Sequence, residues 1–200
     1  MRLRVFLCAI ALSFVGLAGA AEPDVSTLTL PCIACHGMDG AASLPGSANL
    51  GGQNQRYLLR QLELIKSGAR TVPLMTGQLN HLGREQLAQL AAHFAALPLA
   101  TGQAEEATLA QGESIYRAGI AAKGVAACIA CHAPSGGGNS PAGYPHISGQ
   151  PVDYVVAQLT AYREGERTTD DDYGGMMRDV AANLNDGEIK AVANYLRGLH

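Results

Sequence analysis

Apolar residues recur at helical spacing in four stretches of the chain, two in each half. They stand three or four positions apart, which is typical of helices that bury one face. Asn185, followed three residues later by Glu188, is a helix-start signal for the last stretch. No stretch shows sustained strand alternation, so the sequence predicts an all-α protein. The four stretches are Asn54–Ser67, the run after Pro151, Leu87–Phe94 and Ile189–Leu196.

The two halves of the chain repeat one pattern. Cys-Ile-Ala-Cys-His occurs at 32–36 and again at 128–132, an offset of 96. Gly-Gln-x-x-x-Tyr-x-x-x-Gln-Leu occurs at 52–62 and again at 149–159, an offset of 97. We infer a duplication, because chance does not produce two long matches in the same order.

The connection at 97–103 carries turn residues and interrupts the helical pattern. We therefore predict two tandem domains, 21–100 and 101–200, each of a few short helices. In the second half, apolar residues around Ile115 predict a helix ahead of the Cys-x-x-Cys-His motif. In the first half, Val25–Pro31 is short and ends in proline, so no good leading helix is expected there.

Residues 1–20 are interpreted as a signal peptide. Two arginines precede the apolar run Val5–Val15, and Ala18-Gly19-Ala20 is a small-residue cleavage site. The alternative is a retained anchor, although the run is short for a membrane span. Cleavage would remove Cys8 and leave an exported chain, periplasmic in a Gram-negative cell, with two cysteine pairs.

Charge and composition narrow the function. The net charge of −3 argues against nucleic-acid binding. Tryptophan is absent and only three phenylalanines occur, so something else must help to fill the core. Residues 101–200 hold seven basic and twelve acidic groups, a net charge of −5. The run Asp170–Asp172 is interpreted either as a surface that steers a basic partner or as a solvated loop.

Cys-x-x-Cys-His is the attachment sequence for c-type haem. The two cysteines lie on one side of a helical turn, where they reach the haem vinyl groups, and the histidine points a nitrogen at the iron. Zinc binding, thiol–disulfide exchange and structural disulfides are the alternatives. Zinc pairs stand about 15–20 residues apart, whereas 92 residues separate these pairs. The predicted covalent haem ligands are Cys32, Cys35, Cys128 and Cys131, and the predicted proximal ligands are His36 and His132.

Each iron needs a second axial ligand from a later loop. Met38 comes two residues after His36, on the same side of the haem, so it cannot serve. Met75 lies between an amphipathic helix and the closing helix, and Met176 and Met177 hold the equivalent place in the second half. Matching positions in a repeat favour ligands over core filler.

The repeat also chooses between the adjacent methionines. Leu82 follows Met75 by seven residues, and Leu184 follows Met177 by seven, so the register favours Met177 over Met176. Methionine in the sixth position raises the iron potential and fills the site, which indicates electron transfer more than catalysis. Histidines without a counterpart in the other half are rival ligands: His81, His93 and His146.

Together these residues resemble the cytochrome c4 family, dihaem class I cytochromes c. The likeness covers nearly all of the chain after residue 20. Besides both repeated motifs, it rests on Glu-Gly-Glu-Arg-Thr at 164–168, Met-Thr-Gly at 75–77 and Tyr-Leu-Arg-Gly-Leu-His at 195–200. The resemblance implies two haem c groups in two cytochrome c folds related by a pseudo-twofold axis, with the haem propionates near the interface.

The resemblance also implies a function. Such proteins carry electrons in the periplasm from a quinol-oxidising complex or dehydrogenase to a terminal oxidase or another acceptor. The alternatives are a cytochrome subunit of a periplasmic dehydrogenase complex, and a haem enzyme such as a peroxidase.

The first half departs from the family pattern in three places. The family has a proline whose carbonyl accepts the ring N–H of the haem histidine; Pro145 occupies that place in the second half and Ala48 in the first. His93 stands at the aromatic position of Tyr195. The Met75 loop is five residues shorter than its counterpart. These changes make us expect looser packing around the first haem.

Overall fold

A computed structural model describes residues 24–200, and it confirms the all-α prediction. The predicted signal peptide, 1–20, lies outside the described residues. Two isolated β-bridges are the only strand-like pairings within 24–200. The first half contains α1 (Val25–His36), α2 (Gln55–Ser67), the 3-10 helix η1 (Pro73–Met75) and α3 (Arg84–Ala96). The second half contains α4 (Glu106–Ala118), η2 (Ala121–Lys123), α5 (Ile129–His132), α6 (Val152–Arg163), η3 (Asp171–Tyr173), α7 (Met176–Ala181) and α8 (Asp186–Gly198).

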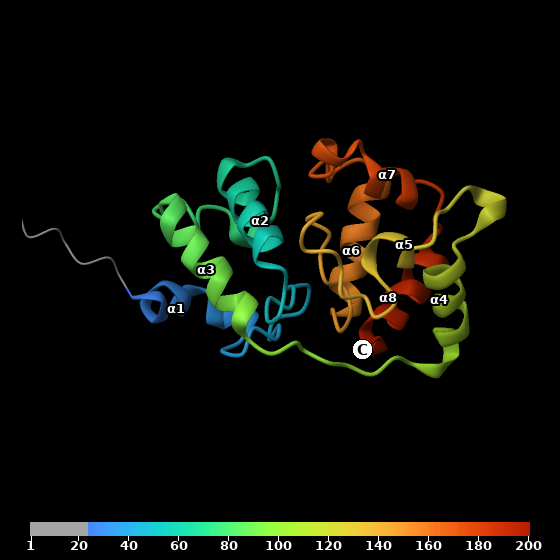
Figure 1. Cartoon of the computed structure of the whole chain (residues 1–200), viewed down its shortest axis with the longest axis horizontal. Coiled ribbons are helices and arrows are strands. Elements are labelled where there is room, and N and C mark those ends of the chain that lie inside the picture. The colour runs from blue at the N-terminus through green and yellow to red at the C-terminus, as the bar shows by residue number, and fades with distance from the viewer. Residues whose placement is uncertain (1–23) are drawn as a thin grey trace, which may run out of the picture.

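The chain forms two lobes joined by an extended segment between α3 and α4 (Figure 1). Each lobe has its own hydrophobic core. In the first, Leu87 and Leu90 of α3 are fully buried with Leu58 of α2. In the second, Ile189 and Val192 of α8 occupy the same role. The division into domains 21–100 and 101–200 stays a prediction.

In the second lobe, α4 packs directly against α8 (Figure 1). Gly112 lies at the crossing, where a Cβ atom would collide with the Ala191 carbonyl oxygen and with Tyr195. The nearby rings of Tyr116 and Tyr195 are in contact, with centroids 5.4 Å apart. A glycine at this position therefore brings the two helix backbones close enough for the aromatic pair to form.

The expectation for the start of the first half was wrong. Helix α1 runs from Val25 through Pro31 to His36 without a break, so the first half has a leading helix that includes the Cys-x-x-Cys-His motif. Proline in a helix interior removes one hydrogen bond. Here Leu28 and Cys32, on either side of Pro31, both pack on the first core, and this packing outweighs the local preference.

Helix ends follow their sequence signals. The Asn54 side chain accepts hydrogen bonds from the Arg56 and Tyr57 amides at the start of α2. Asn185 and Glu188 form the expected reciprocal capping box at the start of α8. Within residues 24–200, none of the helices is both long and apolar enough to cross a membrane.

Candidate functional site at the junction of the lobes

A single cavity of about 590 Å³ extends along both Cys-x-x-Cys-His motifs and across the junction between the lobes. The predicted ligands come from separate elements: the motifs from α1 and α5, and the methionines from η1 and α7. The fold thus brings together residues that are far apart in sequence. Those lining the cavity are Cys32, Cys35, His36, Met75, Cys128, Cys131, His132, Met176 and Met177.

Both motif histidines are held by backbone carbonyls. Nδ1 of His36 lies 2.8 Å from the Ala48 oxygen, and Nδ1 of His132 lies 3.0 Å from the Pro145 oxygen. A carbonyl only accepts, so Nδ1 must carry the proton and Nε2 keeps its lone pair. Burial lowers the pKa of both imidazoles and favours this neutral form, although the carbonyl contacts oppose the shift. Ala48 therefore replaces proline without loss of the hydrogen bond.

None of the four cysteines within residues 24–200 forms a disulfide. Burial raises the pKa of Cys128 to about 11, and burial followed by the neighbouring Cys35 raises the pKa of Cys32. Both thiols are therefore protonated near neutral pH. Among residues 24–200, no cluster of three or more His, Cys, Asp or Glu side chains is arranged to hold a metal ion.

The methionines differ in exposure. Met75 and Met177 are partly buried, whereas the neighbouring Met176 is exposed to 38%. Met38 is 80% exposed and lies outside the cavity lining. Among the rival histidines, His81 and His146 line the cavity, and His93 does not. His93 instead packs edge-on against Phe94, with ring centroids 5.2 Å apart, so it keeps an aromatic packing role.

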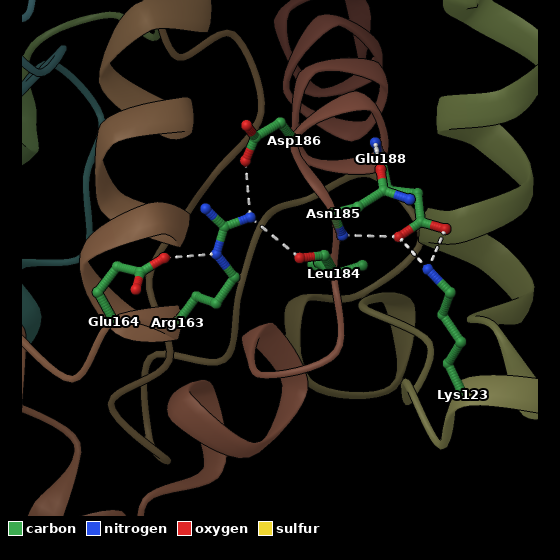
Figure 2. Close-up of polar contacts among 7 residues, drawn as sticks. All are labelled: Lys123, Arg163, Glu164, Leu184, Asn185, Asp186 and Glu188. Carbon is green, nitrogen blue, oxygen red and sulfur yellow. Dashed lines mark hydrogen bonds and ion pairs between the residues drawn. The ribbon is translucent and has the colours of Figure 1, made fainter.

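The segments that carry the methionines are anchored at their far ends. Arg163, at the end of α6, donates to the Leu184 carbonyl at 3.1 Å and to Asp186 at 2.8 Å (Figure 2). In the first half, Lys66 occupies the equivalent place and donates to the Leu82 carbonyl. A basic residue in the last turn of α2 or α6 therefore fixes the chain shortly after the methionine in each half.

The lobes meet through pairs of hydrogen bonds related by a pseudo-twofold axis: a contact from one lobe is repeated by the equivalent residues of the other. The Asn49 amide donates to the Gln150 side chain at 3.0 Å, and that side chain donates back to the Asn49 carbonyl at 2.9 Å. At the equivalent positions, His146 and Gln53 make the same two contacts at 2.8 and 2.7 Å. The repeated glutamine of the Gly-Gln segment thus forms hydrogen bonds with the backbone of the opposite lobe.

Two buried arginines occupy the centre of this interface. Arg70 donates to Gln61 of its own lobe at 2.8 Å, and to Gln158 and Tyr154 of the other lobe at 3.0 and 3.2 Å. Although burial opposes it, the arginine charges lower the pKa of Tyr154. Arg167 makes the exchanged contacts with Gln158, Gln61 and Tyr57.

The repeated motif at 52–62 and 149–159 contains the interface glutamines and tyrosines, but the sequence pattern alone assigned them no role. The signal was available: long polar side chains recur at the same positions in both halves, where a surface would tolerate change. Helical periodicity cannot detect them, because they are buried by the other lobe and not by their own core.

The polar interior fits two haem groups. Arg70 and Arg167 are 8% and 7% exposed, and no carboxylate is among their hydrogen-bond partners within 24–200. The buried Gln61 Nε2 also has no partner there. Buried cations and donors need acceptors, and the carboxylates of haem propionates would supply them. The apolar clefts beside both motifs suit the haem rings.

The acidic run Asp170–Asp172 is solvated at Asp171 and Asp172, whose side chains are 66% and 79% exposed, but not at Asp170. Asp170 is 3% exposed, lies 2.9 Å from Arg178 Nε and accepts the Arg178 amide at 3.0 Å. Asp171 also pairs with Arg178. Asp172 reaches Arg60 of the other lobe at 2.9 Å. All three carboxylates have cationic partners within the chain, because the longer methionine loop folds back onto α7 and α2.

Comparisons with known proteins agree with this arrangement. The cytochrome c family model matches residues 109–200. Cytochrome c4 of Pseudomonas aeruginosa is 44% identical over 96% of this chain and 96% of its own. The chain belongs to the cytochrome c4 family. The crystal structure of reduced cytochrome c4 from Pseudomonas stutzeri has a TM-score of 0.85 and 41% identity, and covers 90% of this chain and 100% of that one.

A further relative has a more specific name. The thiosulfate dehydrogenase electron acceptor of Thiomonas intermedia is 34% identical over 88% of this chain and 80% of its own. The cytochrome c4 fold therefore includes proteins described as acceptors for one enzyme.

Proposed function

We propose that this cytochrome c4-family chain is an exported electron carrier with two haem c groups. The observation that carries the proposal is the cavity that joins both motifs, with a neutral histidine and a methionine from a later element in each lobe. Haem iron, when bound, supplies a one-electron couple. The protein contributes the ligands, the apolar surroundings and the docking of one lobe on the other.

The ligand roles follow the repeat. In each lobe the cysteines would bind the haem covalently, the histidine would ligate the iron from the side of the motif, and the methionine would ligate it from the opposite side. Filled axial positions leave no open site for a substrate, so we assign no catalytic residue. The covalent residues are Cys32, Cys35, Cys128 and Cys131, and the axial residues are His36, Met75, His132 and Met177.

Arg70 and Arg167 would hold the propionates at the lobe interface. Their charges are buried there, and charge-assisted hydrogen bonds to carboxylates are stronger than those to the neutral glutamines and tyrosines that now surround them. Attachment of haem would therefore also stabilise the contact between the lobes.

Mass spectrometry of protein from the periplasm tests the cofactor count. We expect the mature chain, starting near Ala21, plus two haem masses. Replacing Cys32 and Cys35 together by alanine should leave one haem. A mature mass without haem would overturn the proposal, and a mass that includes residues 1–20 would overturn the signal peptide alone.

A cytochrome subunit of a dehydrogenase is the second candidate, and the Thiomonas relative favours it. Size-exclusion chromatography of the native periplasmic protein separates the two. A free carrier elutes at the size of one chain or its oligomer, whereas a subunit elutes with a second, larger chain. Peroxidase turnover by the isolated protein would instead support a haem enzyme.

A further inference from the structure

Several contacts between the lobes depart from the pseudo-twofold exchange, and one of them lies next to the second methionine segment. Arg60 of α2 donates to Asp172 at 2.9 Å, and its guanidinium lies over the Tyr173 ring, 5.2 Å from the centroid. Asp172 and Tyr173 form part of η3, directly ahead of the two methionines on α7. A cation from the first lobe therefore holds the segment that presents Met177.

The second lobe offers no equivalent in return. At the repeat offset of 97, Ala157 stands where Arg60 stands in the first half. The segment ahead of Met75 lacks the five extra residues that place Asp172 and Tyr173 between Thr168 and Met177. The contact is thus one-sided, and it depends on the longer loop of the second copy of the repeat.

The ring of Tyr173 also faces the histidine side of the second site. It packs on Tyr144 at 5.9 Å between centroids, and Tyr144 packs on His132 at 6.5 Å. The next residue, Pro145, accepts the His132 ring proton. The Arg60 contact therefore touches the supports of both axial ligands of the second iron.

From this geometry, and resting on the proposed His132/Met177 ligation, we propose that Arg60 is a positioning residue for the haem of the opposite lobe. It clamps the Met177 segment from outside the lobe and opposes loss of methionine from the second iron. The first iron has no such clamp. The stability of the second iron–methionine bond then depends on how the lobes are docked.

The test is displacement of methionine by imidazole in the oxidised dihaem protein. NMR resolves the two ferric haems, and loss of individual signals in Met75→Ala and Met177→Ala assigns them to the lobes. Arg60→Ala should raise the imidazole affinity of the second haem about three- to tenfold, the range expected for one exposed ion pair and one cation–π contact. The first haem should keep its affinity.

Matched variants separate positioning from general loosening. Arg84→Ala is the control, because Arg84 and Arg60 line one surface groove, but Arg84 pairs with Glu63 of its own lobe at 3.0 Å. Tyr173→Ala should reproduce the Arg60→Ala effect, whereas Tyr173→Phe keeps the ring and should behave as the unmodified protein. These tyrosine variants decide the question even if Arg60→Ala fails to assemble.

Three outcomes overturn the inference. The first is an equal change in imidazole affinity at both haems. The second is an Arg60→Ala protein that behaves as Arg84→Ala, although Met177→Ala still removes the second methionine signal. Each of these two contradicts the role of Arg60 but leaves the proposed ligands in place. If Met177→Ala leaves both methionine signals in place, the proposed ligand set fails and the clamp fails with it.

Discussion

At the scale of single residues, the choice between Met176 and Met177 shows how far the repeat can be used. Alignment of the following leucines selects Met177. The structure adds that both begin α7, that Met177 is partly buried and that Met176 is 38% exposed. Neighbouring helical residues point about 100° apart, so one helix orientation presents one of the two methionines to the iron.

Substitution of each methionine by alanine should therefore give opposite results. Met177→Ala should abolish the methionine–iron charge-transfer absorption of one haem and lower its potential, because methionine ligation raises it. Met176→Ala should leave both absorptions nearly unchanged. Near-infrared spectra and redox titration of the two variants make the comparison. The reverse pattern would mean that the repeat register slips inside this loop.

At the scale of elements, the sequence was most informative where burial is local. The apolar spacing within Asn54–Ser67 predicted α2, and the signal Asn185–Glu188 predicted the start of α8. The prediction for α1 was wrong, because the rule that proline breaks a helix considers Pro31 alone. It does not include the packing of Leu28 and Cys32 on the first core. The sequence analysis also missed the role of η3, because contacts with the other lobe do not produce a periodic pattern of apolar residues in either segment.

The capping box of α8 gives a pH-dependent prediction. Glu188 accepts from Lys123 at 2.8 and 2.9 Å and from the Asn185 amide at 2.9 Å (Figure 2). The Lys123 hydrogen bond, followed by that of Asn185, lowers the pKa of Glu188 below its ordinary value. Its stabilising contribution is therefore present above the unfolded-state pKa and is lost as pH falls through the folded-state pKa.

Glu188→Gln should lower the free energy of unfolding by about 1 kcal/mol at neutral pH and flatten its decline under acid conditions. Urea unfolding at several pH values measures both effects. Glu113→Gln is the control, because Glu113 makes an exposed pair with Arg117 within α4. A Glu188→Gln protein with the same acid dependence as the unmodified protein would show that this carboxylate does not titrate with unfolding.

The α4–α8 crossing gives a packing prediction. Gly112→Ala places a methyl group against the Ala191 carbonyl and Tyr195, so the helices must separate. We expect a loss of about 1–3 kcal/mol in the free energy of unfolding, measured by urea denaturation. Gly83→Ala is a milder comparison, because the nearest atom to its new Cβ is Gln86 Oε1 at 3.8 Å. Equal losses in the two variants would argue against a close-packed crossing.

At the scale of the whole molecule, an interface with a symmetric centre joins lobes of unequal charge. Arg70 and Arg167 give each lobe one buried interface cation. The balance over the whole lobes differs: with these arginines counted, residues 21–100 hold five basic and five acidic groups, whereas 101–200 hold a net charge of −5. Both motif histidines donate to a carbonyl at similar distances, 2.8 and 3.0 Å, so this hydrogen bond does not distinguish the two sites.

Charge should therefore separate the two reduction potentials. Negative surroundings favour the ferric over the ferrous iron, so we expect the second haem to have the lower potential, by on the order of tens of millivolts in water-like dielectric. Stepwise redox titration should need two components, assigned with Met75→Ala and Met177→Ala.

The difference between the two reduction potentials should narrow between about 0.01 and 1 M salt, because the screening length falls from about 30 to 3 Å. Neutralising the exposed Glu166 and Asp179, as Glu166→Gln with Asp179→Asn, should raise the second potential and narrow the gap in the same way. A gap that is insensitive to both salt and these substitutions would assign the difference to buried contacts around the irons and not to the charge of the lobes.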